Sequence, residues 1–122
     1  MGFHRRATFQ FHWHNRDYAD FEAFLAEFSS AKRKKARRDR RRVAEAGIGF
    51  RRLTGHELDP AGWRTVYALL SRTFMARGSM PYFTRGFFER FAAAAPDDVL
   101  VVLAEHGAQA VAAAVFFVGE DT

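Results

Sequence analysis

Residues 99–118 read VLVVLAEHGAQAVAAAVFFV, and this stretch decides the fold of the chain. It holds two apolar runs, Val99–Ala104 and Ala110–Val118, which are joined by a polar segment around Gly107. Two β-prone runs with a short glycine-containing connection are typical of a hairpin. Continuous apolar runs without polar alternation are typical of strands that are buried on both faces. The sequence therefore predicts a hairpin with helices on both sides of its sheet.

Two helices and another strand are predicted before this hairpin. Asp59 and Pro60 are typical of an N-cap and a first helical turn. Thr84 is a second N-cap, and Pro96 stops the helix that it starts. The segment 48–53 reads as a short strand. The apolar faces of the two helices consist of Trp63, Val66, Tyr67, Leu70 and Phe74 in the first and of Phe87, Phe88 and Phe91 in the second.

The first 47 residues have a different character. Thr8–His14 alternates aromatic and polar residues strictly, which predicts a half-buried strand. Asp20 can cap a short helix with one apolar stripe, and residues 31–46 predict a second helix that Gly47 closes. That stripe consists of Phe21, Phe24, Leu25 and Phe28.

These patterns together predict an α/β (α+β) fold. We expect a mixed, mostly antiparallel sheet that is flanked by helices and preceded by a strand and a basic helix. The chain has 122 residues, of which 48% are hydrophobic, and this suits one packed domain at most. The predicted boundary follows Gly47, so that residues 1–47 precede a domain formed by residues 48–122.

Composition also excludes several classes of protein. The chain has no Cys, so it holds neither a disulfide framework nor a thiolate zinc site. Its N-terminal residues lack the apolar core of a secretion signal. The longest apolar stretch, residues 110–118, is about half of the roughly 20 residues that a membrane-spanning helix needs. We therefore expect a cytoplasmic protein without a transmembrane segment.

The net charge of +5 is concentrated in one segment. Lys32–Arg42 contains nine basic residues and one acidic residue, Asp39, for a local charge of +8. The rest of the chain therefore carries −3. Like charges at this density repel one another along a helix, so the segment gains most from an anionic partner. The plainest alternative is a solvated surface helix without a ligand.

Three segments carry a resemblance to a known family. They read GFHRRATFQFHWHN over residues 2–15, DFEAFLAEFSSAKRKKARRDRRRVAEAGI over residues 20–48, and TFMARGSMPYFTRGFFERF over residues 73–91. Together they resemble the bacterial FemAB-like proteins, which are predicted N-acyltransferases linked by name to peptidoglycan biosynthesis. From Ile48 onward, the predicted order of elements resembles the early part of the GNAT acyltransferase fold. We therefore expect an internal fragment of such an enzyme with a partial GNAT-like fold.

The resemblance also implies an acyl donor. Members of the family are longer and look like two GNAT-related halves, with the basic helix between them, and their donor would be acyl-CoA or an aminoacyl-tRNA. A GNAT domain binds the pyrophosphate of acyl-CoA at a glycine-rich turn that opens a helix. No Q/R-x-x-G-x-G/A pattern occurs in this sequence. We therefore expect the fragment to end before the donor loop, to bind no donor and to be inactive alone.

An anionic partner for the basic helix follows from the same resemblance. In FemAB-type enzymes it would be the phosphate of a lipid-linked or sugar-nucleotide peptidoglycan precursor, or an RNA that carries the acyl group. Arginine binds phosphate bidentately. The candidate phosphate ligands are Lys32, Arg33, Lys34, Arg37 and Arg41. The alternative is a non-catalytic module that binds RNA, DNA or anionic lipid through residues 31–46. Against nucleic acid, no aromatic residue interrupts residues 31–42 to offer a stacking surface.

The acceptor side and the catalytic residues are less well defined. In this fold class the loop around residues 77–84 borders the acceptor groove, and we select Arg77 and Tyr82 as acceptor contacts. His56, Glu57 and Asp59 could relay a proton, although a loop and a helix cap are more common roles.

The sequence predicts neither a metal site nor a nucleophilic serine. His12 and His14 are too few for a tight metal site. No serine lies in a nucleophile elbow, so direct attack by the acceptor amine is expected and the catalytic residues stay unassigned. The exposed sheet edges also suggest a homodimer.

Overall fold

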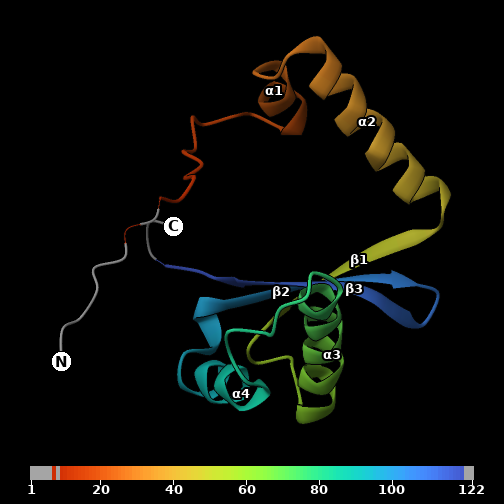
Figure 1. Cartoon of the computed structure of the whole chain (residues 1–122). Helices are drawn as coiled ribbons and strands as arrows, with labels where there is room; N and C mark the ends of the chain where they lie inside the picture. Colours follow the sequence, from red (N-terminus) through yellow and green to blue (C-terminus); the bar gives the residue numbers. More distant parts are fainter. Residues whose placement is uncertain (1–6, 8, 120–122) are drawn as a thin grey trace. The chain divides into compact units, whose positions relative to one another are not determined.

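The computed structural model describes residue 7 and residues 9–119. The chain divides into two compact units, one up to Arg40 and one from Arg41 onward, and the division falls inside a helix. The elements follow in the order α1 (Phe21–Ala26), α2 (Ser30–Glu45), β1 (Ile48–Thr54), α3 (Pro60–Ala76), α4 (Arg85–Ala94), the 3-10 helix η1 (Pro96–Asp98), β2 (Val99–His106) and β3 (Gln109–Phe117) (Figure 1). The predicted α+β fold class is confirmed.

The first unit contains α1 and most of α2. The Asp20 carboxylate accepts a hydrogen bond from the backbone N–H of Ala23 at 2.7 Å and caps α1 as predicted. Leu25, on the apolar stripe of α1, is fully buried. The Arg33 guanidinium of α2 donates to the carbonyl of Ala26 at 3.3 Å and so satisfies one group at the end of α1. The short helix is thus held against the long one.

The predicted strand over Thr8–His14 is wrong for the residues that the structure describes. Residues 9–14 have no strand pairing, and the side chains of Phe9 and Phe11 are 82% and 96% exposed. A strand needs a partner for its backbone hydrogen bonds. The three strands of the described chain pair only with one another, so the alternating pattern has no partner in its own unit.

The second unit is a sheet with two helices. The strands have the order β1-β2-β3, and both pairs are antiparallel. The register places Leu53 opposite Val101 and Leu103 opposite Ala113. In Figure 1, α3 and α4 both lie below the sheet. The core between them consists of Leu53, Trp63, Val66, Phe88, Ala92, Val99, Val101 and Leu103.

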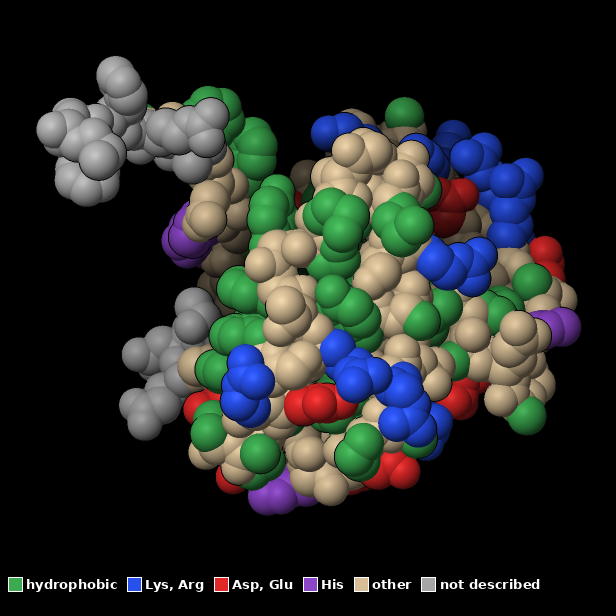
Figure 2. Space-filling model, turned by 60° about the horizontal axis from the view of Figure 1, so that its bottom comes forward, with side chains coloured by type: hydrophobic (Ala, Val, Ile, Leu, Met, Phe, Trp, Pro, Cys, Tyr) green, Lys and Arg blue, Asp and Glu red, His purple; other side chains and the backbone are tan. Residues whose placement is uncertain are grey.

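The predicted burial of the hairpin on both faces is wrong. Along β2, Val99, Val101 and Leu103 are buried, whereas the residues between them are only half-buried. On the face away from the helices, Phe50 is 65% exposed and Phe116 is 49% exposed. The reason lies in the connection, because α3 and α4 both belong to the segment that joins β1 to β2 and pack on the same face of the sheet. Figure 2 shows many hydrophobic side chains at the surface of the molecule.

The turns and edges of the sheet follow the predicted pattern. Gly107 adopts φ +59° in the turn between β2 and β3, which only glycine adopts without strain. Gly47 has φ +71° after α2, and its N–H donates to the carbonyl of Ala44 at 3.0 Å. β1 and β3 form the two edges, and within the described part of the chain no further strand pairs with them. Dimerisation through these edges stays a prediction.

Candidate functional site

Two of the five predicted phosphate ligands have a structural partner inside the first unit. The Arg37 Nε donates to the Glu22 carboxylate of α1 at 2.9 Å. Arg33 donates to the carbonyl of Ala26. Both arginines therefore bridge α2 to α1, and an anion would have to share them with these partners.

The other three predicted ligands differ among themselves. Arg41 belongs to the second unit, where its Nε lies 3.7 Å from the Glu45 carboxylate, one turn further along α2. Among the described residues, Lys32 and Lys34 have no carboxylate within 4.0 Å. Of the five predicted ligands, the two without such a partner thus lie at the beginning of α2, where both lysines are exposed. The five predicted cations do not form one clamp.

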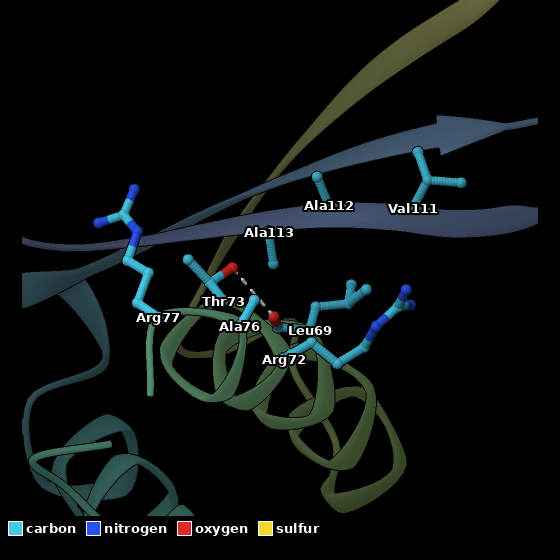
Figure 3. Close-up of a pocket in the computed structure, with 8 residues that line it drawn as sticks. All are labelled: Leu69, Arg72, Thr73, Ala76, Arg77, Val111, Ala112 and Ala113. Atoms are coloured by element: carbon cyan, nitrogen blue, oxygen red, sulfur yellow. Dashed lines mark hydrogen bonds between the residues drawn. The ribbon is translucent and has the colours of Figure 1, made fainter. Parts of the chain in front are cut away.

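A hollow of about 430 Å³ lies between α3 and β3 (Figure 3). Leu69, Ala76 and Ala113 give it apolar walls. Arg72 and Arg77 flank it from its two ends in the view of Figure 3. Arg77 therefore lines a hollow, and its role as an acceptor contact stays a prediction.

Tyr82 does not line this hollow. Its side chain is 88% exposed, and its ring meets the ring of Phe74 edge-on at 5.5 Å between centroids. Tyr82 was predicted to lie near Arg77 because both residues belong to the connection from α3 to α4. The backbone turns between them at Gly78, where φ is +69°. The two residues are not brought together as one site.

The chemistry available in the α3–β3 hollow is binding of an anion. Its lining contains two guanidinium groups and no carboxylate or histidine. The Thr73 hydroxyl donates to the carbonyl of Leu69 at 3.4 Å within α3, so it is already engaged. No group in the lining can take a proton from an amine near neutral pH. The hollow can hold a carboxylate or phosphate of an acceptor but cannot activate its amine.

The cluster His56, Glu57 and Asp59 forms the turn from β1 to α3. Asp59 caps α3, accepting from the N–H of Gly62 at 2.6 Å. The Nε2 of His56 lies 3.0 Å from a carboxylate oxygen of Asp97 in η1. Glu57 accepts from the backbone N–H and the hydroxyl of Thr54 at 2.7 Å and 3.0 Å. Each of the three side chains thus has a structural partner, and they do not form a relay with one another.

The bond from the Thr54 backbone N–H holds the pKa of Glu57 below its ordinary value of 4.5. The Thr54 hydroxyl and the charges of Arg51 and His56 act in the same direction, and they outweigh a small opposing effect of burial. A lowered pKa means that the folded chain prefers the ionised carboxylate. Glu57 therefore stabilises the turn only while it is charged.

Replacing Glu57 by glutamine is expected to lower the Tm at pH 7 and to have progressively less effect as the pH falls. The carboxylate contributes stability that is complete above the pKa of an unfolded Glu and is lost as the pH falls through the lower folded pKa. Thermal unfolding of both proteins between pH 7 and pH 3 measures the difference. Glu45→Gln, which removes an exposed carboxylate 3.7 Å from Arg41, is the control and should change the Tm little. A Glu57→Gln difference that stays constant down to pH 3 would contradict this role.

The described residues do not fit the pyrophosphate of an acyl-CoA donor. Such a site needs free backbone N–H groups where a strand leads into a helix. Among the described elements, β1 to α3 is the one strand-to-helix connection, and the Asp59 carboxylate occupies the start of α3. A second negative charge would be repelled there, so the start of α3 does not suit the pyrophosphate of a donor.

Sequence reasoning missed several groups that the fold brings together. Arg72 lines the α3–β3 hollow. Its spacing from Leu69 and Ala76 places the three residues on one face of the helix, so the sequence could have predicted this position. Arg51 of β1 pairs with Glu105 of β2 at 2.8 Å, which only the strand register reveals. His12 and His14 lie in the irregular segment before α1 and are exposed.

Membrane-spanning helices and metal-binding clusters can also be assessed for the described residues. No helix there combines the length and the apolarity needed to cross a bilayer. No group of three or more His, Cys, Asp or Glu side chains there could hold a metal ion.

Comparison with known proteins gives one match. The family model described as FemAB-like, peptidoglycan biosynthesis/recognition, matches residues 1–122, which is the whole chain. No curated protein and no solved structure matches. A family match of this extent agrees with the three sequence segments that suggested it, and the chain belongs to the FemAB-like family of peptidoglycan biosynthesis and recognition.

Proposed function

We propose that the chain is part of an N-acyltransferase that moves an acyl or aminoacyl group to an amine of a peptidoglycan precursor. The first turns of α2 bind the phosphate of that precursor, and the α3–β3 hollow holds an anionic group of the acceptor. The family match over the whole chain supports the link to peptidoglycan. The observation that carries the binding role is the run of cations on α2, of which Lys32 and Lys34 have no carboxylate partner among the described residues.

The charge on α2 exceeds what its structural contacts use. Glu22, Asp39 and Glu45 each have one arginine of this helix as a partner, so six of the nine cations have no side-chain ion pair within the described chain. Cations that repel one another along a helix are stabilised by a polyanionic ligand. A precursor with two or more phosphate charges supplies that ligand.

The acceptor side of the proposal rests on Arg72 and Arg77. A guanidinium binds a carboxylate or phosphate in a fixed orientation, and two of them at the ends of one hollow can orient a ligand that spans it. The amine attacks the thioester or ester carbonyl of the donor directly, without a covalent enzyme intermediate. The new C–N bond replaces the C–S or C–O bond of the donor, and the CoA thiol or the tRNA hydroxyl leaves with the proton that the amine loses. The donor, acyl-CoA or an aminoacyl-tRNA, is held by residues other than those described for β1 and α3. We propose a cytoplasmic location, because the sugar-nucleotide form of the precursor belongs to that compartment.

The double variant Lys32→Gln/Lys34→Gln is expected to weaken binding of a nucleotide-linked peptidoglycan precursor roughly tenfold, since two exposed charged contacts together contribute on the order of 1.4 kcal/mol. Both lysines are exposed and lack side-chain partners within the described chain, so the fold should not change. Isothermal titration with the intact chain at fixed salt measures the affinity. The matched control is Arg64→Gln/Arg90→Gln, which removes the same charge from exposed positions on α3 and α4.

The outcomes separate the two functions that the sequence left open. A tenfold loss in the lysine variant, with no loss in the arginine control, supports precursor binding at α2. Equal losses in both variants would mean that net charge alone attracts the ligand. If the chain binds DNA, RNA and anionic vesicles as tightly as the precursor, with the same steep salt dependence, it is a non-catalytic anion-binding module.

A further inference from the structure

Aromatic side chains surround a hollow of about 430 Å³ in the first unit. We call it the aromatic hollow, and its lining consists of Trp13, Asn15, Tyr18, Asp20, Phe21 and Phe24. The rings of Trp13 and Tyr18 are nearly parallel, at 25°, with centroids 6.4 Å apart. Phe24 meets both rings edge-on, at 6.2 Å and 5.5 Å. Two rings from the irregular segment before α1 and two rings from α1 therefore converge on one place.

These rings are not simply the core of the unit. Leu25 is fully buried, and Phe24 and Phe28 are half-buried beside it. Trp13, in contrast, is 64% exposed, and Phe21 is 42% exposed. Aromatic faces of this size left in water are costly unless something covers them. A flat ligand that stacks on them would remove that cost.

Cations of α2 adjoin the aromatic hollow. Asp20 and Phe21 also line a second hollow of about 330 Å³, together with Glu22, Arg37 and Arg40. The Arg40 guanidinium lies 4.1 Å from the centroid of the Phe21 ring. The two hollows thus share one wall, with aromatic rings on one side and guanidinium groups on the other.

The carboxylates at this wall are already engaged. Asp20 accepts from the N–H of Ala23 as the cap of α1. Glu22 accepts from Arg37. Arg40 has no carboxylate within 4.0 Å among the described residues, so its charge is balanced only by the face of Phe21. One cation beside the aromatic hollow is therefore available to an anion.

We propose that this place binds the nucleotide part of a ligand, with the base against the Trp13 and Tyr18 side of the aromatic hollow and the phosphate on Arg40. Stacking on aromatic rings suits any nucleobase, and a guanidinium suits phosphate. Residues 31–42 contain no aromatic ring, so the basic helix alone offers no surface on which a base can stack. In the folded unit, residues 13–24 supply these rings. This inference rests on the proposed function, in which α2 binds an anion, and it identifies that anion as the phosphate of a nucleotide.

The test uses Trp13 as its own reporter. The chain has two tryptophans, so Trp63→Phe leaves Trp13 as the single indole while keeping an aromatic ring against Phe88. Uridine monophosphate, uridine and inorganic phosphate are each titrated into this protein, and the quenching of Trp13 fluorescence is followed. Tighter binding of uridine monophosphate than of either part alone is the expected result. Equal affinity for inorganic phosphate and uridine monophosphate would overturn the proposal, because the base would then contribute nothing.

Single substitutions test the base-binding side at Trp13 and the phosphate-binding side at Arg40 separately. Affinity of uridine monophosphate, measured by calorimetry, should fall roughly 5- to 150-fold in Trp13→Ala, the range that one base–aromatic stack gives. Phe11→Ala, which removes a 96% exposed ring of the same segment, should leave it unchanged. Arg40→Gln should weaken the binding of both uridine monophosphate and inorganic phosphate, whereas Arg38→Gln on the same helix should weaken neither. A Trp13→Ala variant with unaltered affinity would overturn the proposal.

A last arm distinguishes the source of the nucleotide. If an eight-residue uridine RNA binds far more tightly than uridine monophosphate, and Trp13→Ala removes the advantage, the nucleotide belongs to a single strand of RNA. If the two bind alike, the site takes one nucleotide, as in a sugar-nucleotide. Both results keep the nucleotide site, and they are independent of the lysine test on α2. If the unaltered chain binds uridine monophosphate but not the precursor, the proposed function is refuted and this site still stands.

Discussion

Replacing Trp63 by alanine is expected to lower the free energy of unfolding by about 3–5 kcal/mol. Trp63 is 3% exposed and lies at the centre of the core of the second unit. Its ring stacks on that of Phe88, with 5.8 Å between centroids and 16° between planes. The substitution removes this stack and leaves a cavity between α3, α4 and the sheet. Because small domains are stable by only about 5–15 kcal/mol, the loss is large.

Urea unfolding followed by circular dichroism measures this effect, and Trp13→Ala is the matched control. Trp13 is 64% exposed and lies outside the core, so its removal should change the free energy of unfolding by less than about 1 kcal/mol. Similar losses in the two variants would contradict the assignment of the core. Both measurements also give the stability background for the nucleotide titrations.

Much of the helical part of the fold was predictable because helix ends are local. Asp20, Asp59 and Thr84 were selected as N-caps, and each accepts a hydrogen bond from a backbone N–H three residues further along the chain. Such a bond depends only on side-chain type and short spacing. The same holds for Gly47 and Gly107, whose positive φ follows from a turn that other residues adopt with strain.

The sheet was predicted less well because strand pairing depends on distant residues. The alternation over residues 8–14 is as regular as that of a half-buried strand, yet no strand pairs with the described residues of this segment. In β2, Leu100 and Val102 are as apolar as their neighbours Val99, Val101 and Leu103, but only the latter three are buried. Composition cannot tell the two faces of the sheet apart, since the packing of α3 and α4 decides which face is covered.

The candidate site follows the same rule. Pairs within α2, such as Arg41 with Glu45, are readable from i,i+4 spacing. Arg37 and Glu22 are 15 residues apart, so only the packing of α1 on α2 shows that this predicted phosphate ligand is already paired. The aromatic hollow beside Arg40 is non-local in the same way. The type of ligand could be predicted from charge, but the residues that are free to bind it could not.

The second large effect is expected at Gly55, where alanine should lower the free energy of unfolding by about 1–3 kcal/mol or more. A Cβ atom at this position would lie 2.7 Å from the Cα and 2.9 Å from the carbonyl oxygen of Pro96. Both are backbone atoms of η1. They cannot move away without breaking the hydrogen bond from the Gly55 N–H to that same carbonyl, which is 3.0 Å long. The turn after β1 and the start of η1 therefore fit only without a side chain.

Gly49→Ala is the matched control for this prediction, because it makes the same chemical change in β1 itself. A Cβ at Gly49 meets nothing within 4 Å. Since glycine inside a strand costs roughly 0.5–1 kcal/mol relative to alanine, Gly49→Ala should leave the free energy of unfolding unchanged or raise it. Urea unfolding of the two variants should thus give opposite or clearly unequal shifts. Equal shifts would mean that the turn and η1 do not approach this closely, and the His56 to Asp97 contact, which spans the same two segments, would lose its support as well.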